Sequence, residues 1–170
     1  MIAELQREVK HIQAAGGHAE HAAVIVRRAV DQAVAVGYKR VAENLHHTHG
    51  QIGGIREHIA HGRRGVEEAM ATADRVSDEA TPEDNEKVLI AASGQIDKAH
   101  QTLLGAHGQI GQLSRAVAET LRGAKPQPTL AALKELEEEL TQAGRAGAKA
   151  KENCVATSAS GSTIGDDSGN

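Results

Sequence analysis

Histidine is the side chain in this sequence best suited to chemistry, because its ring binds metal ions and takes up a proton near neutral pH. The chain has 170 residues and ten of them are histidines. Three pairs have a spacing of three residues, which puts both rings on one helical face; they are His18/His21, His46/His49 and His58/His61. The hairpin described below brings His100 opposite His61, so the sequence predicts a candidate metal site at His58, His61 and His100.

Two other interpretations of these histidines stay open. In the first, they are ordinary surface histidines, because the apolar pattern puts the three candidate ligands beside the core stripe. A di-metal carboxylate bundle needs paired Glu-x-x-His motifs, of which Glu43 and His46 form one, together with further inward-facing glutamates; we do not predict such a bundle. Alternatively, protonating histidines close to Arg56, Arg63 and Arg64 loosens a helix contact, which describes a pH-responsive helical protein.

Other kinds of chemistry are disfavoured. Cys154 is the only cysteine and lies in a segment predicted to be disordered, where no base is held against it. The glycines are scattered, so no phosphate-binding loop is predicted. A net charge of −4 and a single aromatic residue, Tyr38, disfavour nucleic-acid binding. We therefore expect no catalytic residue, no cofactor and no enzymatic activity.

The elements that position these residues are long helices with a heptad pattern. Apolar or small residues recur at steps of three and four, through Ile2, Leu5, Val9, Ile12, Gly16, Ala19, Ala23, Val26, Val30 and Ala33, and again through Thr48, Ile52, Ile55, Ile59, Gly62, Val66, Ala69, Ala73 and Val76. A stutter at Gly37 separates the two series. The pattern predicts one long helix or two stacked helices, with breaks at Gly16–Gly17, Gly37 or 50–54.

A turn near residues 79–82 is the clearest boundary. Thr81 is a good N-cap, Pro82 suits the first helical position, and the acidic residues that follow complement the helix dipole. A second long helix then ends at Gly123. The predicted fold is all-α: an elongated antiparallel helical hairpin or coiled-coil-like bundle, with a hairpin or three-helix bundle over residues 1–123.

Beyond the second helix the sequence predicts three smaller segments. Pro126 and Pro128 indicate a linker at 124–128. A short helix capped by Thr129 follows at 129–148. Residues 149–170 are rich in Ser, Thr, Gly and Ala, so we expect a disordered tail.

An internal repeat supports the hairpin. The sequence His-Gly-Gln-Ile-Gly occurs at 49–53 and again at 107–111, and the midpoint of the two copies is residue 80, inside the predicted turn. In an antiparallel hairpin the copies lie opposite one another, unless they are only the trace of a duplication. The predicted helix-contact residues are Gly50, Ile52, Gly53, Gly108, Ile110 and Gly111.

The apolar stripe of residues 2–39 and the distribution of charge indicate which partners the protein binds. In the hairpin, residues 2–39 have no partner of matching length unless the chain folds back near Gly37. An uncovered apolar stripe binds another chain, so the most favoured function is a non-enzymatic scaffold or interaction module that binds itself or a helical partner. Acidic residues gather at 67–86 and basic residues at 39–65. The acidic part is a solvated tip or a docking surface for a basic partner.

No apolar run is long enough to span a membrane, and the first residues contain no apolar core of a signal sequence. We therefore expect a cytoplasmic protein, with leaderless export as an open alternative.

The Ala-, Gly- and His-rich helical sequence around 99–101 and 105–111 resembles small helical proteins of high-GC actinobacteria. The hairpin outline also resembles the helical-hairpin substrates of type VII secretion, which implies export. Those substrates carry a Trp-x-Gly turn, whereas this turn is Ala80-Thr81-Pro82-Glu83. Their export signature is a tyrosine followed four residues later by an acid, whereas Tyr38 is followed by Ala42.

Overall fold

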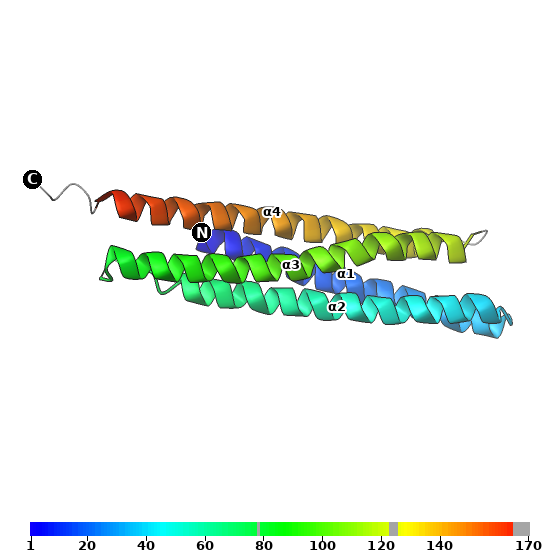
Figure 1. The fold of residues 1–170 in the computed structure, drawn as a ribbon. Helices are drawn as coiled ribbons and strands as arrows, with labels where there is room; N and C mark the ends of the chain where they lie inside the picture. Colours follow the sequence, from blue (N-terminus) through cyan, green and yellow to red (C-terminus); the bar gives the residue numbers. More distant parts are fainter. Residues whose placement is uncertain (78, 123–125, 165–170) are drawn as a thin grey trace, which may run out of the picture.

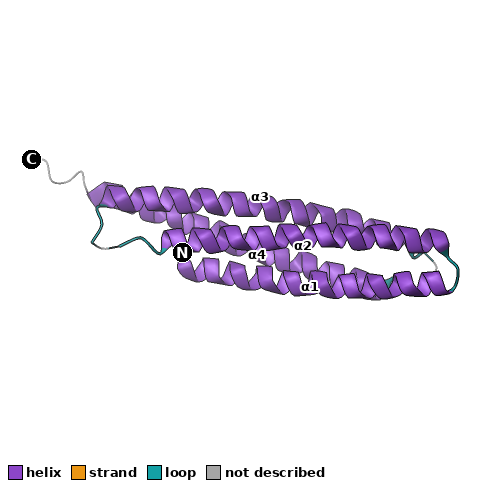
Figure 2. Ribbon diagram, turned by 90° about the horizontal axis from the view of Figure 1, so that it is seen from below, coloured by secondary structure: helices purple, strands orange, loops and turns teal. Residues whose placement is uncertain are grey.

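Four long helices form the protein in a computed structural model, which describes residues 1–77, 79–122 and 126–164, the last five by their backbone only. The helices are α1 (Ile2–Ala35), α2 (Lys39–Ala73), α3 (Pro82–Thr120) and α4 (Gln127–Ile164). Each helix runs antiparallel to the one before it, and the four pack in the order α1, α2, α3, α4 and back to α1 (Figures 1 and 2). The described residues contain no strand. The predicted all-α, elongated helical bundle is confirmed.

The core is a narrow column filled by one stripe of each helix. Most of the predicted heptad positions are buried, and their branched side chains alternate with alanines; the largest fully buried ones are Leu5, Ile12, Val26, Leu45, Ile52, Ile55, Ile96, Ile110, Leu113, Leu133 and Leu136. Alanine buries little area but lets helix axes approach closely. A core without aromatic rings is therefore compatible with a well-packed bundle.

The chain folds back at Gly37, one of the breaks that the sequence allowed. Gly37 has a φ of +80°, a left-handed conformation that glycine adopts at no steric cost. The next helix begins at Lys39, so α1 packs along α2 on one side and along α4 on the other. The stripe of residues 2–39 is thus covered within the chain. The argument for self-association from an uncovered N-terminal stripe was wrong.

The turn between α2 and α3 lies where it was predicted. Thr81 is the N-cap of α3, and its Oγ1 accepts a hydrogen bond of 3.2 Å from the backbone N–H of Asp84. Pro82 occupies the first helical position, and Glu83 accepts a hydrogen bond of 2.9 Å from Lys87 Nζ. The exposed carboxylates of this first turn lie at the positive end of the helix dipole.

The C-terminal helix is longer than predicted. It begins at Gln127, so Thr129 is a buried residue of the first turn and not the N-cap. It also continues to Ile164, well beyond the expected end at 148, so residues 149–164 are helical where a disordered tail was expected. Gln127 and Pro128, which were predicted to belong to the linker 124–128, are helical. Residues 123–125 and 165–170 lie outside the described residues.

Small side chains explain that error. A series at steps of three and four continues the core stripe of α4 and is buried; it consists of Ala143, Ala146, Ala150 and Cys154. The Cys154 thiol donates to Met1 Sδ at 2.9 Å, so the end of α4 packs against the start of α1. Such residues resemble a low-complexity tail in sequence, but a neighbouring helix gives them a surface to pack on.

Candidate functional site

The predicted helix-contact residues divide into two groups. Ile52 and Ile110 are fully buried in the core. The register of Gly62 against Leu103, continued along α2 and α3, places Ile52 within one helical turn of Ile110. The four glycines of the repeat are different: a Cβ added at any of them would meet nothing within 4 Å; they are Gly50, Gly53, Gly108 and Gly111. Their predicted role in close helix approach was wrong, because they flank the seam.

Other glycines make the close approaches. A Cβ at Gly62 would lie 2.6 Å from Leu103 Cδ2, and one at Gly65 would lie 3.1 Å from Ala99 Cβ. Both positions are on the side of α2 that faces α3. Gly62 belongs to the heptad series and Gly65 does not, so the series could have identified only one of these two packing glycines.

The predicted three-histidine site is not formed. His58 Nδ1 donates to the Gly54 carbonyl at 2.8 Å, and His61 Nδ1 accepts from Arg64 at 3.4 Å, so both rings are engaged on α2. His100 Nε2 instead donates to Glu8 Oε1 at 2.9 Å. Among the residues that the structure describes, no three His, Cys, Asp or Glu side chains are placed to share a metal ion.

The Glu8–His100 pair is the most deeply buried polar contact described. The Glu8 side chain is 0% exposed although it is a carboxylate, and the His100 side chain is 18% exposed. The pair joins α1 to α3 diagonally across the bundle, and it fits there because α4 presents Gly147. A Cβ at Gly147 would collide with the His100 ring and would lie 2.6 Å from Glu8 Oε2. Glycine at 147 is thus a requirement of this buried pair.

Three further histidines bind carboxylates across helix interfaces. His11 Nδ1 lies 2.7 Å from Glu139, His18 Nδ1 lies 3.1 Å from Glu135, and His107 Nε2 lies 3.7 Å from Glu137. All three carboxylates belong to α4, whose lysines also bind α1 and α3 through Lys149–Glu4 and Lys151–Asp97. These histidines align α4 with its neighbours, a role that the sequence did not reveal because no motif links them to partners thirty or more positions away.

A mostly apolar groove runs between α3 and α4. It encloses about 520 Å³ and is lined by leucines and small residues of both helices, with histidines and an arginine at its rim; the lining is His100, Leu103, Leu104, His107, Leu140, Thr141, Gly144, Arg145 and Ala148. Leu104 is 69% exposed at its edge. Gly144 leaves open space beside it, since a Cβ there would meet nothing within 4 Å. We call this surface the α3–α4 groove.

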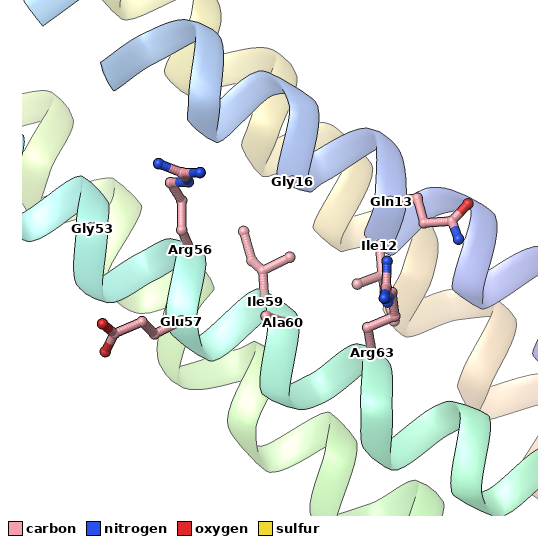
Figure 3. Close-up of a pocket in the computed structure, with 9 residues that line it drawn as sticks. All are labelled: Ile12, Gln13, Gly16, Gly53, Arg56, Glu57, Ile59, Ala60 and Arg63. Atoms are coloured by element: carbon pink, nitrogen blue, oxygen red, sulfur yellow. The ribbon is translucent and has the colours of Figure 1, made fainter. Parts of the chain in front are cut away.

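A second groove lies on the opposite edge of the bundle, between α1 and α2, and encloses about 600 Å³ (Figure 3). Ile12 and Ile59 form its apolar floor, and Gly16 widens it. Arg56 and Arg63 extend from α2 toward α1 on either side of Ile59, whereas Glu57 points away from α1. We call this surface the α1–α2 groove.

Cys154 has none of the features of a nucleophile. Its side chain is 1% exposed, and burial raises the pKa of the thiol, an effect that the nearby N-terminal amine partly opposes. A buried thiol with a raised pKa is unreactive at neutral pH.

No described helix is long and apolar enough to cross a membrane. Comparison with protein-family models, with curated proteins and with solved structures found no significant match.

Proposed function

We propose that this protein is a non-enzymatic interaction module that self-associates through the α3–α4 groove. The observation that carries the proposal is the exposed side chain of Leu104 directly beside an apolar groove on the same surface. An isolated exposed leucine is ordinary, but an apolar knob next to an apolar hole is typical of a binding surface.

A second copy of the chain fits this surface because the protruding Leu104 side chain and the groove that can accept it lie next to each other. In a two-fold symmetric dimer the same patch meets itself, so each copy must offer both halves of every contact. Leu104 of one copy then enters the groove of the other copy over Gly144, between Leu140 and Ala148. Gly105 and Gly108 lie on the exposed side of α3, and the space around both is open, so two α3 helices can approach closely.

Solution mass as a function of concentration tests the proposal. We expect sedimentation equilibrium to give a dimer for the wild-type chain and a monomer for Leu104→Gln, because a polar amide is poorly accommodated in an apolar groove. The matched control is Ile90→Gln: Ile90 is 62% exposed on the same helix but lies outside the groove. It should leave the dimer intact.

The α3–α4 groove is tested separately from Leu104. A Cβ at Gly144 would meet nothing within 4 Å, and the remainder of the side chain of Gly144→Leu enters the groove, so this variant should also give monomers while helix content stays unchanged. A wild-type chain that stays monomeric at every concentration refutes the proposal, and so does a dimer that neither substitution weakens.

A further inference from the structure

The α1–α2 groove combines an apolar floor with two half-exposed arginines, each of which forms one ion pair with a glutamate. Arg56 lies 3.8 Å from Glu20 and Arg63 lies 3.3 Å from Glu67. Within the described part of the chain, neither guanidinium makes a hydrogen bond, although each carries five N–H donors. The side chains are 47% and 45% exposed, so both remain accessible to a partner.

We propose that the α1–α2 groove binds an acidic amphipathic helix of another protein. The partner carries two carboxylates seven residues apart with an apolar side chain between them. The carboxylates bind Arg56 and Arg63, and the apolar side chain enters the gap over Gly16 and Ile59. This site is separate from the α3–α4 groove, so a self-associated protein presents one such site on each copy.

The spacing of the arginines selects a helix as the occupant. Arg56 and Arg63 are two helical turns apart on α2, which is about 10 Å along the axis. A small anion reaches one guanidinium at a time, whereas a helix lying along the groove repeats the same interval in its own side chains. Helix-in-groove recognition places apolar anchors at steps of three and four residues. An anchor four residues after the first acid therefore lies between the two arginines.

The space beside Gly16 suits an apolar side chain of moderate size from the partner. Gly16 lacks a side chain, and a Cβ there would already lie 3.9 Å from Ile59 Cγ2. The gap accordingly has room for a side chain from outside because α1 supplies none at this position. Arginine suits the flanks because its planar guanidinium binds carboxylates through two parallel hydrogen bonds.

A synthetic peptide serves as the probe. It is a fluorescently labelled helical peptide with glutamates seven residues apart and a leucine four residues after the first, and binding is measured by fluorescence anisotropy at low salt. We expect saturable binding to the full-length protein, weakened about tenfold or more by Arg56→Gln combined with Arg63→Gln. Gly16→Leu should also abolish binding, because its side chain fills the gap.

Matched controls separate the groove from general electrostatics. Arg64→Gln removes one positive charge from the same helix outside the groove, and Gly17→Leu adds the same bulk to an open position of α1. Neither should change the affinity. A control peptide of equal composition, with its glutamates five residues apart, should bind at least tenfold more weakly. The proposal is overturned if both peptides bind equally, if neither binds, or if the groove substitutions have no effect.

Discussion

Gly147→Ala tests whether the buried Glu8–His100 pair controls the stability of the bundle. The added methyl group would collide with the His100 ring and come within 2.6 Å of Glu8 Oε2, so the pair must separate or the helices must move apart. Because the Glu8 side chain is 0% exposed, a displaced His100 leaves a carboxylate buried without its partner.

The expected change in the free energy of unfolding is the sum of two opposing effects. Leaving a buried charge without its hydrogen-bonded partner costs about 3–5 kcal/mol. Replacing glycine by alanine within a helix stabilises the folded state by about 1 kcal/mol, because alanine has the higher helix propensity. The net loss in the free energy of unfolding is about 2–4 kcal/mol, which lowers the melting temperature of a chain of this size by roughly 5–15 °C. Gly94→Ala is the control, because a Cβ there would meet nothing within 4 Å and only the favourable effect remains.

Far-ultraviolet circular dichroism during urea denaturation is the appropriate assay, since the chain has no tryptophan and helix content reports folding. A double-mutant cycle with Glu8→Ala isolates the mechanism. In the Glu8→Ala background no carboxylate is left to be stranded and His100 is free to turn outward, so Gly147→Ala should cost much less. An equal cost in both backgrounds, or a Gly147→Ala protein as stable as Gly94→Ala, would refute the reasoning.

Three further predictions follow from the packing. Gly62→Ala should be less stable to urea than Gly53→Ala by about 1–3 kcal/mol, because only the former pushes into Leu103. Deleting residues 149–170 should lower the denaturation midpoint, because it uncovers the α1 surface on which Ala150 and Cys154 pack. The Cys154 thiol should react with a disulfide reagent slowly in the native protein and rapidly in denaturant. Burial raises its pKa, so the folded state keeps the proton to higher pH than the unfolded state. The stability contributed by the thiol is therefore present below about pH 8.5 and is lost as the pH rises further; Cys154→Ala should lose less stability over that interval.

The sequence by itself predicted an all-α fold of long helices, their buried stripes and the turn that precedes α3. Heptad spacing identified the buried stripe, and the capping residue Thr81 with Pro82 located the turn between α2 and α3, because these signals act locally along the chain. Gly37 was among the predicted breaks, although the pattern left open whether the chain bends there. The turn at residues 36–38, in which Gly37 is left-handed, joins α1 to α2, and this turn lets α2 cover the N-terminal stripe.

Only the tertiary structure decided which residues meet across helices. The repeat glycines at 50, 53, 108 and 111 were predicted to lie at a close helix contact, yet among these four together with Gly62 and Gly147, only the last two face a neighbour at short range. The predicted hairpin register placed His100 opposite His61, but the partner of His100 is Glu8, 92 positions away. The sequence specifies the size of a glycine and the chemistry of a histidine. Which atoms lie beside each of them depends on how the helices pack, so the tertiary structure alone shows whether a glycine is required and which group a histidine binds.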